Sequence, residues 1–256
     1  MTATPDKSSH AKRVLIVSMG GTLGMRPARG GTLRPDAVLQ DLFKWVPELE
    51  GYASVSLEIL ANLDSSLMEP CHWLLLASRI GKAQAEEQYD GIVVLQGTDT
   101  LAYTAAALSF LLLNIAMPVV LTGAQRPLAV TRTDARNNIL GAVESALEGP
   151  IEVMVFFNHK VYRGNRVTKV AISDFHGFDS PNFPLLGRAG LAWEWNEELF
   201  WPHTKRPPLW RALPQALPSA PLVLPWVPGL AFDHLEAVLG GQWALVLEAT
   251  REAAEH

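Results

Sequence analysis

The chain has 256 residues and a formal net charge of −5, with 48% hydrophobic and 18% charged residues. This composition excludes a chain that is disordered throughout, because disorder requires low hydrophobicity and high net charge, and the length allows a sizeable core. The acidic balance and the lack of any run of Lys or Arg argue against nucleic-acid binding through phosphates.

Residues 1–12 are polar and lack the apolar stretch of a signal peptide. The longest apolar stretch, residues 101–120, is interrupted by polar side chains and by Pro118, which predicts a buried helix and a strand instead of a membrane span. Cys71 is the only cysteine, so we expect no disulfide framework and no cysteine metal site, and Cys71 itself should be a small buried hydrophobic residue. We therefore expect a cytoplasmic protein with no membrane partner.

Short runs rich in Val, Ile and Leu alternate with longer helical patterns along the chain. The runs predict strands at residues 14–18, 55–60, 92–95, 119–122 and 153–157, and the patterns predict helices at residues 35–45, 71–88, 99–114 and 134–148. The runs are nearly continuous in apolar character, as expected for strands covered on both faces. The alternation predicts an α/β fold with a doubly wound, mostly parallel sheet, in which ligands bind beyond the carboxyl ends of the strands.

The composition changes between residues 202 and 228, where eight of the 18 prolines fall. Proline at this density is typical of a linker. We predict a catalytic domain at residues 13–200, a proline-rich linker at 201–221 and a truncated C-terminal α/β unit at 222–250, with a strand at 222–224, a helix at 231–239 and a strand at 243–248. A unit of this size cannot bury its own core and must pack on the main domain or on another subunit.

Three predicted strands are followed by loops in which glycine precedes a hydroxyl or amide side chain. Gly20-Gly21-Thr22 follows the first strand, Gly97-Thr98-Asp99-Thr100 the third, and Gly123-Ala124-Gln125 the fourth. Glycine lets the backbone approach a ligand closely, although each loop alone is equally well explained as a turn with Thr or Asp capping a helix. None has the spacing of a dinucleotide-binding or phosphate-binding loop.

Together and in this order, the loops resemble the bacterial-type L-asparaginases, which carry Gly-Gly-Thr near the N-terminus and Gly-Thr-Asp-Thr further along. The other segments that share this resemblance are Asp64-Ser65-Ser66-Leu67-Met68, residues 118–127 with Asp134 and Asn138, Phe156-Phe157-Asn158, residues 162–166, Val167-Thr168-Lys169 and Ser180-Pro181-Asn182. Those after residue 155 look like the cytoplasmic, type I branch of the family. The resemblance runs continuously from about Val14 to Gly190.

The resemblance implies a catalytic set. Thr22 is similar to the hydroxyl that attacks the amide carbon first and forms an acyl-enzyme, and Thr98, Asp99 and Lys169 are similar to the family's Thr–Asp–Lys cluster. A threonine hydroxyl is a poor nucleophile without a proton acceptor, and a neutral lysine can be that acceptor.

The resemblance also implies the residues that hold the substrate. Asp99 would bind the substrate ammonium, and Ser65, with Asp64 beside it, would hold the α-carboxylate. Gly21 and Gly97 would let the backbone approach the substrate, N–H groups of the Gly97–Thr98 loop would stabilise an oxyanion, and Ala124 would contact the leaving amide. No metal or organic cofactor is implied, and the seven histidines show no metal-ligand spacing.

Several positions depart from the family pattern. The loop after Gly-Gly-Thr normally carries a Tyr that partners the first threonine, whereas Thr32 or a neighbour stands there. Gln96 replaces a His, which we expect to tune activity because both side chains form hydrogen bonds, and Leu67 replaces an acidic residue. The C-terminal domain is shortened, so we expect a more open pocket and weaker or altered substrate binding.

The expected function is hydrolysis of L-asparagine to L-aspartate and ammonia through an acyl-threonine intermediate, by a homodimer or homotetramer. L-Glutamine or another small amide is the near alternative substrate. Two other functions stay open. One is an amino-acid-sensing module with little turnover, which the missing Tyr and the shortened domain favour. The other is a subunit of a larger amidotransferase, which the lack of a basic surface opposes.

Overall fold

The computed structural model describes residues 12–27, 33–35, 37–86, 88–202, 210, 222–225 and 245–248. The chain divides into two compact units, residues 1–213 and 214–256. Within these described ranges no helix is long and apolar enough to cross a membrane.

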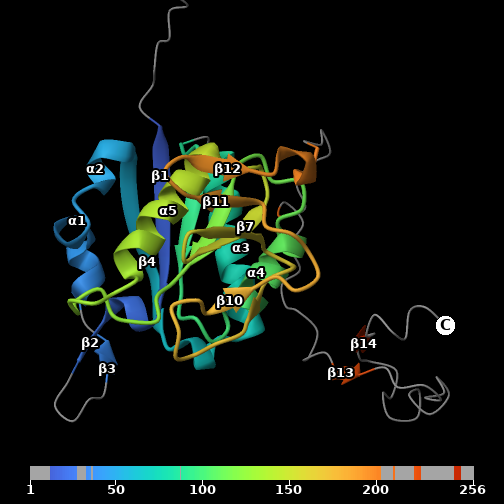
Figure 1. The fold of residues 1–256 in the computed structure, drawn as a ribbon, viewed down its shortest axis with the longest axis horizontal. Coiled ribbons are helices and arrows are strands. Elements are labelled where there is room, and N and C mark those ends of the chain that lie inside the picture. The colour runs from blue at the N-terminus through green and yellow to red at the C-terminus, as the bar shows by residue number, and fades with distance from the viewer. Residues whose placement is uncertain are drawn as a thin grey trace, which may run out of the picture. The chain divides into compact units, whose positions relative to one another are not determined.

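The first unit contains an eight-stranded sheet with the order β12-β11-β8-β7-β6-β5-β1-β4 (Figure 1). Its five parallel strands are β1 (Arg13–Gly20), β4 (Ser54–Leu63), β5 (Gly91–Leu95), β6 (Val119–Thr122) and β7 (Val153–Phe157). An antiparallel extension follows, made of β8 (Lys160–Arg163), β11 (Gly187–Ala189) and β12 (Trp193–Trp195). The predicted α/β fold with a doubly wound, mostly parallel sheet is confirmed, and each of the five predicted strands is present.

Helices cover both faces of the sheet because alternate strand residues point to opposite sides. On one face, α3 (Pro70–Ala85) and α4 (Leu101–Leu111) pack against a buried cluster that includes Leu15, Val94 and Leu121. On the other face, α1 (Leu42–Trp45), α2 (Leu49–Tyr52) and α5 (Ala135–Glu148) pack against a second cluster that includes Ile16, Val93 and Val120. Every residue of β5, β6 and β7 is consequently buried.

Three predictions are corrected. β4 is not covered on both faces: it is an edge strand, and none of its residues is fully buried. Cys71 is exposed, because it lies in the first turn of α3 and the buried residues of that helix begin at Leu76. The helix predicted at residues 35–45 is a 3-10 helix, η2 (Ala37–Asp41), that leads into the single turn of α1.

The sequence patterns did not predict the shorter elements. They are η1 (Thr22–Gly24), the hairpin β2 (Met25–Pro27) and β3 (Leu33–Pro35), α2, η3 (Ser65–Leu67), β8, β9 (Thr168–Lys169), β10 (Phe178–Asp179), β11, β12 and η4 (Glu197–Leu199). β12 carries Trp193 and Trp195, whose rings stack with centroids 4.9 Å apart. Trp193 and Trp195 therefore pack against each other at the end of the sheet.

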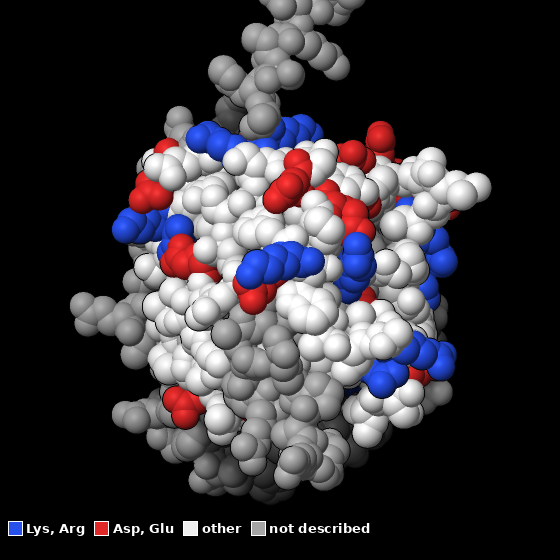
Figure 2. Space-filling model, turned by 90° about the vertical axis from the view of Figure 1, so that its left-hand side faces the viewer, with Lys and Arg blue, Asp and Glu red and all other residues white. Residues whose placement is uncertain are grey.

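Charged residues of both signs are interspersed on the face that carries α1 and α2 (Figure 2). Lys44 pairs with Asp41 at 2.6 Å, and Arg136 on α5 forms an ion pair with Glu48. The hydrogen bond from Arg136 lowers the pKa of the Glu48 carboxyl. Among the described residues, this face therefore carries charges of both signs, some of them paired.

A buried ion pair joins the antiparallel extension to the rest of the sheet. Arg163, at the end of β8, is 8% exposed and donates to both carboxylate oxygens of Glu152, which is 10% exposed, at 2.6 and 3.1 Å. It also donates to the carbonyl of Leu199 at 2.6 Å, beyond β12. Arg163 thereby links the start of β7 to the segment that ends the sheet.

Glu152→Gln is expected to lower the free energy of unfolding by about 3 kcal/mol, because loss of one partner leaves the buried guanidinium charge uncompensated. Urea unfolding measures the change. Lys44→Ala is the matched control: its side chain is 80% exposed, so loss of its pair should change stability by less than about 1 kcal/mol. Similar losses in the two variants would contradict this role for Glu152.

In the second unit the structure describes two strands, β13 (Leu222–Pro225) and β14 (Leu245–Glu248), which pair in parallel. A parallel pair requires a crossover connection between its strands. The helix predicted at residues 231–239 lies outside the described residues. The domain boundaries 13–200, 201–221 and 222–250 stay predictions.

Candidate active site

The loops after β1 and β5 meet at the carboxyl edge of the sheet. The chain runs from β1 to β4 on one side and then crosses to β5 on the other side of β1, so this edge is a topological switch point. Gly21 has φ of +95°, and a Cβ added there would lie 2.2 Å from the backbone nitrogen of Gly97. Thr22 and Thr98 each follow one of these two glycines, so the fold brings the two predicted threonines to one place.

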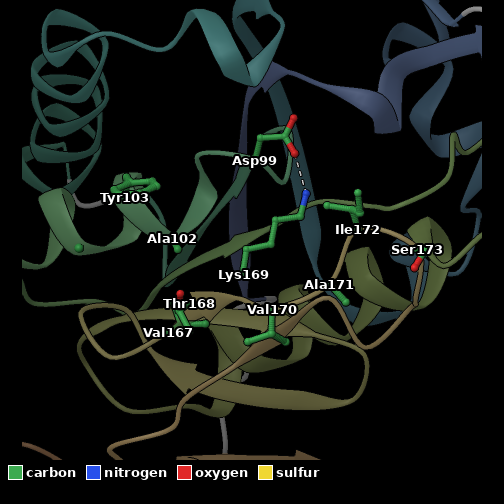
Figure 3. A pocket seen from close by; sticks show the side chains of 11 residues that line it. Asp99, Ala102, Tyr103, Val167, Thr168, Lys169, Val170, Ala171, Ile172 and Ser173 are labelled. Atoms are coloured by element: carbon green, nitrogen blue, oxygen red, sulfur yellow. Dashed lines mark hydrogen bonds and ion pairs between the residues drawn. The ribbon is translucent and has the colours of Figure 1, made fainter. Parts of the chain in front are cut away.

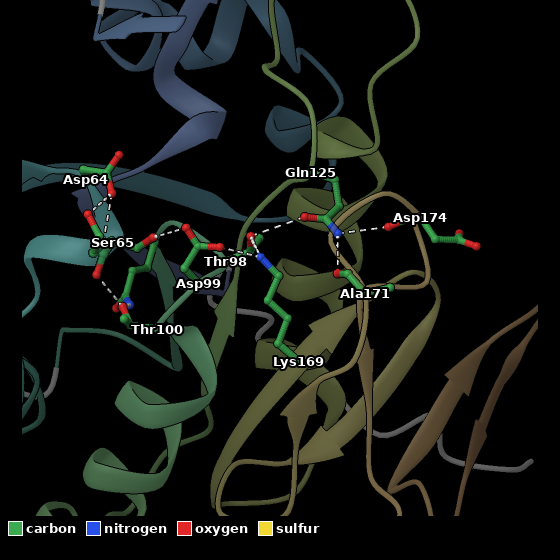
Figure 4. Close-up of polar contacts among 11 residues, drawn as sticks. Asp64, Ser65, Thr98, Asp99, Thr100, Gln125, Lys169, Ala171 and Asp174 are labelled. Atoms are coloured by element: carbon green, nitrogen blue, oxygen red, sulfur yellow. Dashed lines mark hydrogen bonds and ion pairs between the residues drawn. The ribbon is translucent and has the colours of Figure 1, made fainter.

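Thr98, Asp99 and Lys169 form a hydrogen-bonded cluster (Figure 4). Lys169 lies on β9, which pairs with β10, and its Nζ is 2.7 Å from Thr98 Oγ1 and 2.6 Å from Asp99 Oδ1. Thr98 is 5% exposed and the Lys169 side chain 15%, whereas the Asp99 side chain is 63% exposed. The arrangement places a hydroxyl within proton-transfer distance of an amine, with a carboxylate open to solvent beside them.

Ser65 lies next to this cluster, at the start of η3. Its Oγ donates to Asp99 Oδ2 at 3.4 Å, and a Cβ added to Gly97 would lie 2.7 Å from that same Oγ. Asp64 is exposed, and its carboxylate accepts from the hydroxyl and the backbone N–H of Ser66 at 2.7 and 2.9 Å. These bonds lower the pKa of the Asp64 carboxyl. The structure therefore places Ser65 among the candidate residues and turns the Asp64 side chain towards the adjacent turn.

A chain of hydrogen bonds from Gln96 through Thr100 holds the Ser65 backbone in place. Gln96 is 1% exposed and its Nε2 donates to Thr100 Oγ1 at 3.0 Å, while that hydroxyl donates to the carbonyl of Ser65 at 2.8 Å. The Gln96 Oε1 atom is buried without a hydrogen-bond partner. Gln96 thus acts through the position of Ser65, and its role in tuning activity stays a prediction.

The remaining predicted residues fall as follows. Thr22 is half-buried in η1. Ala124 is 1% exposed and its methyl group packs in the core, so a contact with a leaving amide would come from its backbone. The position expected for the missing Tyr, Thr32 or a neighbour in residues 28–32, lies outside the described residues.

Gln125 was placed in a strand-end loop by the sequence but assigned no role. Its carboxamide contacts Thr98 and the loop after Lys169 (Figure 4). The only sequence signal for it was its place directly after Ala124 in that loop.

An open groove of about 750 Å³ lies beside Lys169 and Asp99 (Figure 3). Its walls are mostly apolar and come from α4 and from the segment after β9, including Ala102, Tyr103, Val170 and Ile172. Ile172 is 82% exposed and Tyr103 is 68% exposed. In the part of the chain that the structure describes, no group of three or more His, Cys, Asp or Glu side chains is arranged to hold a metal ion.

Comparisons with known proteins show the family to which the chain belongs. Residues 13–200 match the family model described as asparaginase, N-terminal. L-asparaginase 1 of Escherichia coli K12 is 42% identical over 184 residues, which cover 70% of this chain and 54% of that protein. This chain thus spans about half the length of that relative.

Solved structures show the same fold. The thermostable L-asparaginase from Thermococcus kodakarensis superposes with a TM-score of 0.77 at 30% identity, over 92% of this chain and 70% of that one. The probable cytoplasmic L-asparaginase from Campylobacter jejuni superposes with a TM-score of 0.67 at 26% identity, over 95% and 78% of the two chains. Because the family model matches residues 13–200, which contain all eight strands of the sheet, this chain belongs to the asparaginase family.

Proposed function

We propose that this protein hydrolyses the side-chain amide of L-asparagine to give L-aspartate and ammonia. The observation that carries the proposal is the Thr98–Lys169–Asp99 cluster, in which Lys169 Nζ is 2.7 Å from the Thr98 hydroxyl oxygen. The Gly21 loop contacts the backbone of Gly97 beside this cluster. The E. coli and T. kodakarensis relatives named as L-asparaginases support the same substrate.

In this mechanism the Thr22 hydroxyl attacks the amide carbon. The Thr22 oxygen–carbon bond forms, the carbon–nitrogen bond breaks, and ammonia leaves with the proton of the hydroxyl. Water then adds to the acyl carbon, the ester bond breaks, and Thr22 recovers its proton. Neutral Lys169 accepts the proton of Thr98, which in turn accepts one from the attacking hydroxyl or water. Backbone N–H groups of the Gly97–Thr98 loop stabilise the oxyanion formed at each addition.

Substrate binding in this proposal uses the polar groups beside the cluster. The exposed Asp99 carboxylate binds the α-ammonium of the substrate, and the Ser65 hydroxyl donates to its α-carboxylate. Gly21, Gly97 and the backbone of Ala124 let the substrate approach the loops closely, and Asp64 holds the turn that carries Ser65.

The test is ammonia release from L-asparagine, L-glutamine and a panel of larger amides, together with the melting temperature in the presence of L-aspartate. Turnover of asparagine above the other amides supports the proposal. Preference for L-glutamine or another amide favours that alternative substrate, because the groove of about 750 Å³ has room for an amide larger than asparagine. No turnover, with a melting temperature raised by aspartate, assigns the chain to the sensing function instead.

We also propose a cytoplasmic homodimer or homotetramer. The sequence of α4 contains no charged residue, and its outward face carries Tyr103 and Phe110, which are 68% and 61% exposed and lie two helical turns apart. An exposed apolar face of this kind is typical of a protein interface. The printed name of the C. jejuni neighbour agrees with the cytoplasmic location.

Phe110→Glu is expected to dissociate the oligomer into smaller species, because a charge buried in an apolar interface loses its hydration. Sedimentation velocity of the variant and the parent measures the change. Leu191→Glu is the control, since Leu191 is an exposed apolar residue between β11 and β12 and is not part of α4. A parent that sediments as a monomer, or a Phe110→Glu variant that sediments as the parent oligomer does, would contradict this interface.

A further inference from the structure

The Gln125 carboxamide lies between Thr98 and the loop that follows Lys169 (Figure 4). Gln125 follows β6, and its backbone N–H donates to Asp134 Oδ2 at 2.9 Å, which fixes the start of the side chain. Its Oε1 accepts from the Thr98 hydroxyl at 3.3 Å. Its Nε2 donates to the carbonyls of Ala171 and Asp174 at 3.0 and 2.9 Å (Figure 4). All polar atoms of the carboxamide are therefore engaged.

The contacts of Gln125 leave only one orientation for its amide. Two carbonyl oxygens face one end, so that end must be the NH₂ group, because an oxygen there would meet two acceptors. The end that faces Thr98 is consequently an acceptor. In this resting arrangement the Thr98 Oγ1 atom is held by two bonds, one donated by Lys169 and one donated to Gln125, and the hydroxyl proton must turn from Gln125 to Lys169 before it is transferred.

The same carboxamide holds the segment that follows Lys169. Ala171 is two residues after Lys169, and the N–H groups of Val170 and Ala171 both donate to the Gly177 carbonyl, at 2.9 and 3.3 Å, which closes residues 170–177 into a compact loop. Residues 170–173 also line the groove. One side chain from the loop after β6 therefore links Thr98 to the segment that follows Lys169.

We propose that Gln125 is a positioning residue that sets the distance between Thr98 and Lys169 by bracing Thr98 against the 170–177 loop. This inference rests on the proposed function. Gln125 has no contact with Asp99 or Ser65 among the interactions of the described residues, so it should act on the chemical step and leave substrate binding unchanged.

Gly177 is the counterpart of Gln125 in the loop. A Cβ added at Gly177 would lie 2.7 Å from Gln125 Nε2 and 3.3 Å from its Cδ. Alanine at this position must therefore displace the carboxamide from its two carbonyl partners. A shorter side chain at residue 125 would remove that conflict.

The first test compares Gln125→Met with the parent in ammonia release from asparagine. Methionine has nearly the same shape and no amide, so kcat should fall at least about tenfold while KM stays within about twofold. A parent-like kcat would overturn the inference and leave the proposed function standing. A raised KM with unchanged kcat would also overturn it, because it would make Gln125 a substrate-binding residue.

The second test is a double-mutant cycle with Gly177→Ala and Gln125→Ala. Gly177→Ala should reproduce the kcat loss of Gln125→Met in the parent and add less than about twofold in the Gln125→Ala background, because the atom it displaces is gone. Gly51→Ala is the control, since nothing lies within 4 Å of the Cβ added there. Equal effects of Gly177→Ala in both backgrounds would overturn the coupling.

The third measurement does not depend on activity. Amide hydrogen exchange should be faster over residues 168–177 in Gln125→Met than in the parent, with exchange in α3 unchanged. If the parent releases no ammonia from any amide, the proposed function fails and this exchange alone decides the role of Gln125. Faster exchange then supports the brace, and unchanged exchange overturns it.

Discussion

Lys169→Met is expected to lower kcat for asparagine by at least about a hundredfold, which corresponds to a loss of about 2.7 kcal/mol of transition-state stabilisation. Methionine replaces the apolar stem of lysine but has no amine to accept the proton of the Thr98 hydroxyl, which is 2.7 Å from Lys169 Nζ. Initial rates of ammonia release over a range of asparagine concentrations measure kcat and KM separately. Thr98→Ala should cause a loss of similar size, and the double variant should lose little more, because the two groups act as one unit.

The matched control for this prediction is Lys82→Met. Lys82 lies on the exposed side of α3, so its replacement should leave kcat within about twofold of the parent. Circular dichroism should show the parent fold in every variant. A Lys169→Met protein that keeps more than about a tenth of the parent kcat would place the proton acceptor elsewhere.

Gly21→Ala is expected to abolish measurable turnover and to lower the free energy of unfolding by about 2–4 kcal/mol. The φ of +95° at Gly21 is strained for a residue with a Cβ, and the added methyl group would lie 2.2 Å from the Gly97 nitrogen and 2.4 Å from its Cα. Both neighbouring atoms belong to the backbone, so relief requires the two loops to separate. Thr22 and Thr98 would move apart with them. Ammonia release and urea unfolding measure the two effects.

The comparison that isolates the effect of loop contact is Gly51→Ala, where the added methyl group meets nothing within 4 Å. Gly51 lies in a helix, so alanine there should be neutral or slightly stabilising. Gly21→Ala with near-parent kcat would show that the Thr22 and Thr98 loops need not touch for activity.

The candidate site residues that follow strands could be predicted from the sequence because local patterns determine where strands end. Runs of Val, Ile and Leu indicate buried strands, and parallel strands bring their carboxyl ends to one edge of a sheet. Thr22 and Thr98 follow two such runs directly. Lys169 follows no run of this kind, and only the family resemblance connected it with Thr98, from which it is 71 residues away in the chain.

Other features depended on pairings that the sequence does not show. β11 and β12 have three residues each, too few to display a periodic pattern, and they exist because they pair with β8 and with each other. The strand order places β4 at the edge of the sheet, where it pairs only with β1. Residues of this apolar strand are therefore partly exposed. The exposure of Cys71 follows from the packing of α3, whose buried residues begin only at Leu76.

The sequence by itself determined the fold class, the parallel core and the loops that carry Thr22, Thr98 and Asp99, because each depends on residues adjacent in the chain. Tertiary structure decided which side chains meet. Gln125 reaches Thr98, Ala171 and Asp174, which are 27, 46 and 49 residues away, and Arg163 reaches Leu199, which is 36 residues away. Such contacts form only when the sheet brings separate strand ends together, and the sequence has no local signal for them.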